Sequence, residues 1–149
     1  MVEGKPIRGR CLCGIVQFEL VPPTDFCSHC HCESCRLAHG SAFVTWTSVP
    51  LKRFSYIQGK ENVKWYQSSE YILWGFCQTC GSHMFYRAEK EGHPESPQID
   101  RMYISVGSIT DPLDRDPQRH VSYEERFSWM KAKDGLPKHR GKTEEKMGN

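Results

Sequence analysis

The sequence predicts an all-β protein of short antiparallel strands, and three observations lead to this fold class. Apolar and polar residues alternate with a period of two along most of the chain, which is typical of strands with one buried face. No stretch shows the sustained longer period of an amphipathic helix. The alternating segments are short and are separated by Gly, Pro, Asn or Ser turns. We therefore expect a mainly antiparallel all-β domain with one or two short helical turns.

The expected strands are rich in β-branched and aromatic residues. The first covers residues 15–20, alternates apolar and polar side chains, and stops at Pro22 and Pro23, as a strand entering a turn should. Six more strands are expected at close spacing, over residues 42–46, 54–58, 63–67, 71–76, 83–87 and 102–106.

Two helical pieces and one long loop interrupt these strands. Residues 33–39 are closed by Gly40, which fits one or two turns with a glycine at the C-terminal cap. Residues 111–113 predict a further turn, because Asp111 precedes a first-turn proline. Residues 88–101 are charged and contain two prolines, so they are interpreted as an exposed loop.

Length and composition indicate one soluble domain with a charged tail. The 149 residues carry a net charge of only +2, so binding to nucleic acid is not expected. A bilayer-spanning helix needs about 20 consecutive apolar residues, and the sequence has no such run, so no membrane association is expected. We expect residues 1–137 to form the domain. Residues 138–149 have too little apolar surface to fold alone and are predicted to form a flexible tail.

All eight cysteines occur in close pairs, and this spacing indicates metal binding. Two thiols separated by one or two residues can both bind a single ion, and zinc takes thiolates in tetrahedral geometry. The alternative is a framework of four disulfides between pairs. The first ten residues contain no apolar segment of a secretory signal, so a reducing, cytoplasmic location is expected and metal is favoured. The pairs are Cys11/Cys13, Cys27/Cys30, Cys32/Cys35 and Cys77/Cys80.

The outer two pairs predict one closed structural site. Cys77 and Cys80 follow an expected strand and are succeeded by Gly81, as in a zinc knuckle whose tight turn needs positive φ. Cys11 and Cys13 precede another strand and are also followed by glycine. The sequence permits several combinations of pairs, and this one is favoured because each pair supplies two ligands from a β-turn and the two together complete a four-thiolate site.

The middle cysteines predict a second and different site. Cys30, Cys32 and Cys35 can supply three ligands, and the fourth position is left to Cys27, a histidine, water or substrate. Three protein ligands with an open position are typical of catalytic zinc, whereas four thiolates are typical of structural zinc. The helix expected from residue 33 would place its positive N-terminus beside these thiolates and favour their ionised form. Two zinc ions per chain are therefore expected.

The three cysteine clusters, in this order, resemble those of the glutathione-dependent formaldehyde-activating enzyme family, which also contains the centromere protein V domain. The resemblance extends over nearly the whole chain. It rests on Cys11-Leu-Cys13-Gly14, Cys30-His-Cys32-Glu-Ser-Cys35-Arg36 and Phe76-Cys77-Gln-Thr-Cys80-Gly81, and continues through Trp46, Val49-Pro50, Phe85-Tyr86, residues 106–109, residues 120–125, Trp129 and residues 134–137.

The resemblance implies a β-tent-like zinc fold. It also implies a structural zinc at Cys11, Cys13, Cys77 and Cys80, and a second zinc at Cys30, Cys32 and Cys35 that is associated with glutathione chemistry. The implied activity is of the carbon–sulfur lyase type, in which glutathione adds to formaldehyde to give S-hydroxymethylglutathione. The sequence departs from the family pattern at Cys27, which would close the second site if it bound the metal.

The residues around the second site allow two classes of function. In the enzyme hypothesis, Cys30, Cys32 and Cys35 are catalytic, Arg36 binds a substrate carboxylate or neutralises the thiolates, and His31 supports the site from behind. The substrates are then a small thiol such as glutathione and an aldehyde. The alternative is a non-catalytic zinc module that binds a protein or nucleic-acid partner. Candidate fourth ligands or proton carriers are His29, His31, His39 and His83.

Overall fold

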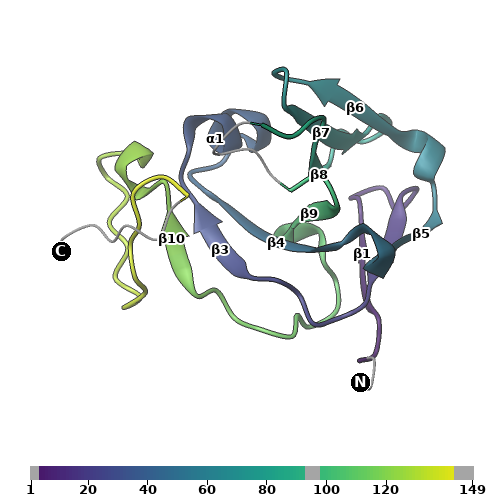
Figure 1. Cartoon of the computed structure of the whole chain (residues 1–149), viewed down its shortest axis with the longest axis horizontal. Coiled ribbons are helices and arrows are strands. Elements are labelled where there is room, and N and C mark those ends of the chain that lie inside the picture. Colours follow the sequence, from purple (N-terminus) through teal and green to yellow (C-terminus); the bar gives the residue numbers. More distant parts are fainter. Residues whose placement is uncertain (1–3, 93–97, 143–149) are drawn as a thin grey trace.

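Ten short strands form most of the secondary structure in residues 4–92 and 98–142, which are the residues that the computed structural model describes (Figure 1). The predicted all-β class is confirmed. The strands are β1 (Ile7–Arg10), β2 (Gln17–Leu20), β3 (Cys27–Cys30), β4 (Val44–Pro50), β5 (Phe54–Gln58), β6 (Val63–Gln67), β7 (Ile72–Cys77), β8 (His83–Ala88), β9 (Arg101–Ser105) and β10 (Arg119–Val121). The helical segments are α1 (Glu33–His39) and the 3-10 turns η1 (Leu51–Arg53), η2 (Lys60–Asn62), η3 (Val106–Ser108) and η4 (Tyr123–Glu125).

The strands form two sheets. The smaller has the order β1-β2-β5, and the larger has the order β10-β3-β4-β9-β8-β7-β6. The strand pairs are antiparallel except β10 with β3, which run parallel with Val121 opposite Cys30. Figure 1 shows β3 and β10 at one side of the molecule, β1 and β5 at the other, and α1 near β7 and β8.

Two apolar cores hold this arrangement together. The first lies between the small sheet and β8 and β9, where the Phe18 and Phe85 rings are fully buried with centroids 5.0 Å apart. The second surrounds Cys30, Cys32 and Cys35 with aromatic side chains, including Trp46 and Tyr86. The three cysteines are therefore part of a packed interior, which holds their sulfur atoms in place.

The predicted strands are present with bounds shifted by a few residues at most, but three further strands were not predicted. β1, β3 and β10 are short and contain charged, histidine or cysteine residues instead of the alternating apolar pattern. β10 lies beside β3 although about ninety residues separate them, so this parallel pairing depends on tertiary contacts that local sequence does not reveal.

The predicted helix over residues 33–39 is confirmed, and the predicted turn over residues 111–113 is wrong. In α1 the Cys32 side chain caps the N-terminus and Gly40 caps the C-terminus at φ 62°. The 3-10 turn in this region is η3, which ends before Asp111. The Asp111 carboxylate instead accepts a hydrogen bond from the Arg8 backbone N–H at 2.9 Å and so ties this segment to β1.

The first residues of the predicted tail pack against the domain. Residues 138–142 lie against β10 and η4, and the backbone N–H groups of His139 and His120 donate to the carbonyls of His120 and Pro137, both at 2.8 Å. The His139 side chain is buried. Residues 143–149, and residues 93–97 of the predicted loop, lie outside the described residues. Within the described part of the chain, no helix is long and apolar enough to cross a membrane.

Candidate functional site

The first candidate metal centre contains Cys11, Cys13, Cys77 and Cys80, as the sequence predicted. Cys11 follows β1, Cys77 ends β7, and their sulfur atoms lie with the other two within 4.8 Å of one another. The Sγ–Sγ distance is 3.6 Å from Cys11 to Cys13 and 3.8 Å from Cys13 to Cys77. Four thiolates at tetrahedral positions around zinc lie about 3.8 Å apart, given zinc–sulfur bonds of about 2.3 Å. The four sulfur atoms therefore fit such an ion.

Both turns of this centre depend on glycine. Gly14 has φ 81° and Gly81 has φ 77°, conformations that residues with a side chain rarely adopt. Each glycine N–H donates to the carbonyl of the first cysteine in its turn, at 3.1 Å for Cys11 and 2.7 Å for Cys77. The Asn62 side-chain N–H also donates to Cys77 Sγ at 3.2 Å. Donors of this kind stabilise thiolates and orient them toward a metal.

The second group contains three cysteines, Cys30, Cys32 and Cys35. They come from the end of β3, the N-terminal cap of α1 and its first turn, and all three are buried. Cys35 Sγ lies 3.6 Å from Cys30 Sγ, again close to the tetrahedral spacing. The Cys35 N–H donates to Cys32 Sγ at 3.3 Å, and the Trp46 indole N–H donates to Cys35 Sγ at 3.4 Å. The group can therefore hold a metal through three thiolates.

The close approach of three buried thiols in this group favours the binding of a cation. Hydrogen bonds with Cys30 and Cys35 lower the pKa of the Cys32 thiol far below its usual range. Hydrogen bonds with Cys30 and Cys32, together with burial, raise the pKa of the Cys35 thiol far above it. Three buried thiols this close cannot all ionise unless a positive charge offsets their repulsion, and a bound metal deprotonates a ligating thiol outright.

A cavity of about 250 Å³ opens beside Cys32 and Cys35. It combines an apolar wall with polar and charged groups, among them Lys142, whose charge adds to the larger effect of the hydrogen bonds with Cys30 and Cys35 in lowering the pKa of Cys32. Ser122 lines it with φ 50°, a strained conformation of the kind that concentrates at functional sites. The lining consists of Cys32, Ser34, Cys35, Ile72, Trp74, Tyr86, Ser122, Glu124, Glu125, Gly141 and Lys142.

Several of these lining residues were not predicted as functional. Lys142 belongs to the segment expected to be a flexible tail, and no role was assigned to residues 120–125. The signal that could have found residues 120–125 is the family resemblance, which extends through them.

Burial raises the pKa of the Glu125 carboxyl, and the Glu125 carboxylate accepts a hydrogen bond from the backbone N–H of Glu33 at 3.3 Å. Glu125 is therefore a carboxyl group beside the cysteines that holds a proton more readily than an exposed glutamate.

His31 lies behind the cysteines in a buried hydrogen-bonded chain. Its Nε2 is 2.8 Å from His120 Nδ1, and His120 Nε2 is 2.8 Å from the carboxylate of Asp134. Both rings are almost fully buried. Because Asp134 accepts from His120 Nε2–H, His120 Nδ1 accepts from His31 Nε2–H. These hydrogen bonds hold the His31 ring against His120, and His31 belongs to neither group of cysteines that could hold a metal.

Arg36 does not line the cavity beside Cys32 and Cys35. Its guanidinium donates from Nε to the carbonyl oxygen of His31 at 3.3 Å and lies 4.2 Å from the centroid of the Phe127 ring. Among the described residues, the basic side chain that lines the cavity is Lys142. The roles expected for Arg36 and His31 toward a substrate stay predictions, because their observed contacts are with the protein.

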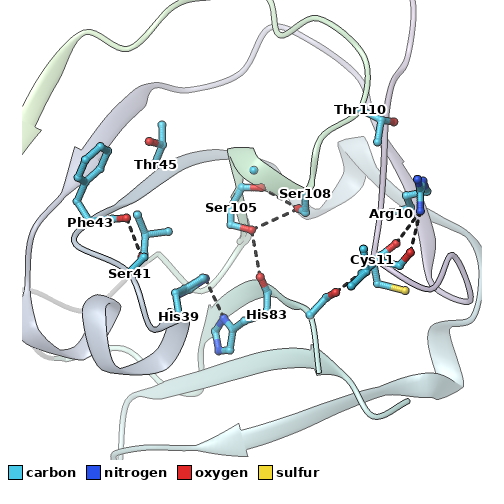
Figure 2. Close-up of a pocket in the computed structure, with 14 residues that line it drawn as sticks. Arg10, Cys11, His39, Ser41, Phe43, Thr45, His83, Ser105, Ser108 and Thr110 are labelled. Carbon is cyan, nitrogen blue, oxygen red and sulfur yellow. Dashed lines mark hydrogen bonds between the residues drawn. The ribbon is translucent and has the colours of Figure 1, made fainter. Parts of the chain in front are cut away.

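His39 and His83 form a hydrogen-bonded pair at the other end of α1 (Figure 2). His39 Nδ1 is 3.2 Å from the carbonyl oxygen of Cys35, so it donates there, and His39 Nε2 accepts from His83 Nδ1 at 3.1 Å. Burial, and the charge that His39 would carry, lower the pKa of His83 to about 4. Both rings are therefore neutral near pH 7. In the described residues, no histidine joins either cysteine group.

The neutral pair predicts a loss of stability in acid. Between pH 6.5 and about pH 4 the unfolded chain binds a proton at residue 83 and the folded chain does not, so unfolding becomes more favourable as the pH falls. We expect the free energy of unfolding to fall by about 3 kcal/mol more in the native protein than in His83→Gln over this range. Urea unfolding of both proteins at each end of the range measures the difference, in which effects of metal release common to both cancel. Equal losses would contradict the prediction.

Cys27 is not brought into either metal-ligand group. It starts β3, where Cys30 is three positions further on and so lies on the other face of the strand. Burial raises the pKa of the Cys27 thiol to about 11, with a smaller opposing effect of Arg115. Gln118 accepts a hydrogen bond from its backbone N–H at 3.3 Å. The metal-ligand role considered for Cys27 is therefore not supported, and the second group has three thiols.

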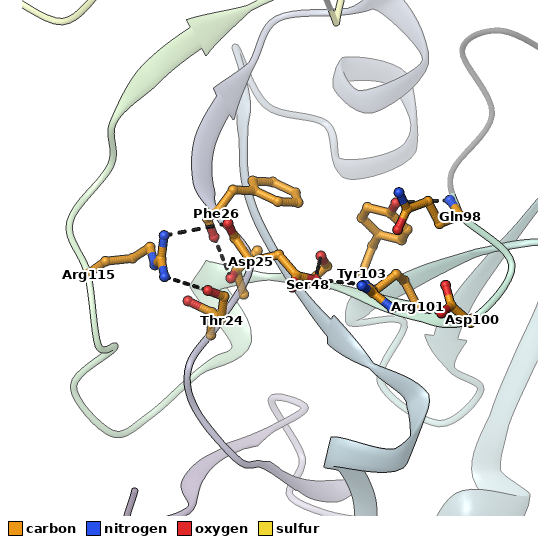
Figure 3. A network of polar contacts seen from close by, with 10 residues as sticks. Thr24, Asp25, Phe26, Ser48, Gln98, Asp100, Arg101, Tyr103 and Arg115 are labelled. Carbon is orange, nitrogen blue, oxygen red and sulfur yellow. Dashed lines mark hydrogen bonds and ion pairs between the residues drawn. The ribbon is translucent and has the colours of Figure 1, made fainter. Parts of the chain in front are cut away.

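A polar network secures the chain at the start of β3 (Figure 3). The Asp25 carboxylate accepts from the Ser48 hydroxyl at 2.6 Å and pairs with Arg101 Nε at 3.0 Å. Arg115 donates to the backbone carbonyl of Thr24. These contacts bind segments from β4, β9 and the chain before β10 to the strand that carries Cys27 and Cys30, so they place the second group within the sheet.

The fold and the two cysteine groups define a class of small β-sheet protein with two groups of cysteines, one of four and one of three, that can each hold a metal ion. The model of the glutathione-dependent formaldehyde-activating enzyme family matches residues 6–125. The chain belongs to this family.

The chain is also similar to a yeast protein in sequence and to a bacterial protein in fold. A Schizosaccharomyces pombe protein named as an uncharacterized lyase is 32% identical over 84 residues, which cover 53% of this chain and 56% of that protein. The match thus spans little more than half of the yeast protein's length. A crystal structure of a Rhodobacter sphaeroides protein shares the fold with a TM-score of 0.53 at 23% identity, and the match covers 74% of this chain and 92% of the other.

Proposed function

We propose that this protein is a zinc-dependent enzyme of the carbon–sulfur lyase type that handles thiol–aldehyde adducts, with glutathione and formaldehyde as the substrates that the family name indicates. The observation that carries the proposal is the three-cysteine group, which has no fourth protein ligand among the described residues and which borders a cavity. The other group, of four cysteines, has the ligand number that is typical of a closed structural zinc site. A cytoplasmic location would keep these thiols reduced.

In the proposed reaction the thiol adds across the aldehyde carbonyl. The carbon–sulfur bond forms, the π bond of the carbonyl breaks, and the thiol proton ends on the new hydroxyl. Cys30, Cys32 and Cys35 would hold a zinc ion, whose positive charge would stabilise an incoming thiol in its thiolate form. The three thiolates would reduce the net charge at this position, so holding the thiol is favoured over strong polarisation of the aldehyde.

The protein side chains supply the remaining needs of this reaction. Lys142 gives the cavity a positive charge that attracts a carboxylate of a glutathione-like thiol. Glu125 lines the same cavity, and its raised pKa suits it to hold a proton and deliver it to the aldehyde oxygen. The buried aromatic wall of Trp74 and Tyr86 excludes water from one side. Bringing both reactants into one small cavity accelerates their addition by proximity.

The proposal predicts that Cys32→Ser leaves a folded protein without activity. The variant should lose one metal ion per chain and retain the other, because Cys32 belongs to the open group alone. Enzyme-dependent formation of S-hydroxymethylglutathione should fall at least about 100-fold, since loss of a ligand removes the site that binds the thiol. Metal content, the far-ultraviolet circular dichroism spectrum and the initial rate above the uncatalysed reaction measure these effects.

Cys27→Ala is the matched control for this experiment, because it also removes a buried cysteine but lies outside both groups. It should keep both metal ions and the activity. A folded native protein with two metal ions that does not accelerate the reaction at all would contradict the proposed function. That result would favour the alternative, a metal-stabilised module that binds a partner.

A further inference from the structure

A groove of about 460 Å³ lies between α1 and β7, next to the cavity at the open cysteine group. One wall is the face of α1 that carries Ser34, Leu37 and Ala38, which are spaced as one side of a helix. The other walls come from β6, β7 and β8 and the chain between β6 and β7. These walls consist of Tyr66, Ser68, Trp74, Phe76 and His83.

The groove continues from the metal side of the site. Trp74 and Ser34 line both the groove and the cavity that contains Cys32 and Cys35. On β7, alternate residues face the same side, so Ile72 and Trp74 border the cavity and Trp74 and Phe76 border the groove. The four residue steps from Ile72 to Phe76 correspond to about 13 Å along the strand, so this face extends over about that length. The Trp74 indole N–H donates to the Ser68 hydroxyl at 2.7 Å, which holds the shared ring in place.

The groove differs in chemistry from the cavity that it adjoins. No acidic residue, lysine or arginine occurs among the described residues that line it, and His83 is neutral because burial lowers its pKa. Leu37 is 74% exposed and Tyr66 is 63% exposed, so large apolar surface faces solvent on both sides. Apolar surface gathered in a concave place is typical of a ligand-binding site. The charged groups, Glu124, Glu125 and Lys142, all lie on the cavity side.

We propose that this groove binds the hydrocarbon substituent of an aldehyde larger than formaldehyde, so that the enzyme acts on adducts of apolar aldehydes. The inference rests on the proposed function for the identity of the reacting groups. In such an adduct the new carbon–sulfur bond joins a charged, glutathione-like thiol to a carbon with a hydroxyl and the hydrocarbon chain. The charged thiol matches the cavity that contains Lys142, and the hydrocarbon chain matches the uncharged groove. The balance of atoms is the same as for formaldehyde.

A binding experiment tests the groove without any requirement for catalysis. Hexanol, which has an apolar chain and no reactive carbonyl, is titrated into zinc-loaded full-length protein, with methanol as the comparison. We expect saturable nuclear magnetic resonance shifts at the Leu37 and Ala38 amides and at the Trp74 indole N–H with hexanol only. Ala38→Trp, which fills the groove from the exposed face of α1, should abolish them. The control Ile57→Trp adds the same ring on β5, outside the residues that line the groove, and should leave them unchanged.

A kinetic series supplies the second test. With glutathione as the thiol, kcat/KM for propanal, pentanal and heptanal should rise about fourfold with each methylene added, until the groove is full. Ala38→Trp should remove this rise, and Ile57→Trp should keep it. The inference would be overturned by an active enzyme whose kcat/KM does not rise with the length of the aldehyde. It would also be overturned if the hexanol shifts were absent, or if they persisted in Ala38→Trp. If no aldehyde reacts, formaldehyde included, the proposed function fails, and the hexanol shifts alone decide whether the groove binds hydrocarbon.

Discussion

Replacing Cys80 by serine is expected to unfold the domain. Cys80 belongs to the four-thiol group that joins the turn after β1 to the turn between β7 and β8. A structural zinc site in a small domain contributes about 10–16 kcal/mol of apparent binding free energy, whereas a whole domain is stable by only about 5–15 kcal/mol. Circular dichroism during heating should therefore show no cooperative transition, and the purified variant should hold no metal in the first group.

The control variant for this experiment is again Cys27→Ala. Cys27 is more deeply buried than Cys80, but it belongs to neither metal-ligand group. We expect it to unfold cooperatively and to hold two metal ions per chain. If Cys80→Ser instead melted as cooperatively as the native protein, the group of four would not be the structural centre. Cys32→Ser provides the contrast, because only its metal content and activity are expected to change.

The second large effect is expected at His120, whose ring lies between His31 and Asp134 in the buried chain. His120→Ala would leave the Nε2 donor of His31 unsatisfied and open a cavity beside it. Together these changes should lower the free energy of unfolding by about 3–5 kcal/mol. For a domain of this size the melting temperature should then fall by about 10 °C. Differential scanning calorimetry of metal-loaded protein measures the change.

Asp134→Asn is the graded companion to this variant. The asparagine carbonyl oxygen can still accept from His120 Nε2–H, so only the charge of the acceptor is lost. We expect a loss of about 1 kcal/mol, which is the difference between a charge-assisted and a neutral hydrogen bond. A His120→Ala protein within 1 kcal/mol of the native protein would show that the buried chain does not hold this part of the fold.

Local patterns in the sequence determined the fold class and the metal-ligand groups. Alternation along residues 54–58 and 63–67 predicted β5 and β6 with the bounds that the structure has. Gly40 predicted the end of α1 because a helix C-terminus favours a residue that adopts positive φ. The cysteine groups were predictable because two thiols one or two residues apart must lie near each other in any fold, which leaves few ways to complete a tetrahedral site.

Only the tertiary structure decided which other side chains meet at the open group. Lys142 reaches the cavity because residues 138–142 pair with β10 and η4, and that contact follows from the parallel pairing of β10 with β3. Neither pairing has a local pattern, because both join segments far apart in the chain. For the same reason the groove between α1 and β7 was not visible from spacing. The exclusion of Cys27 became visible only once the structure showed β3, an unpredicted strand whose alternation places Cys27 and Cys30 on opposite faces. Close sequence spacing brought together most of the cysteines that can hold a metal, whereas long-range packing determined the cavity that the open group faces.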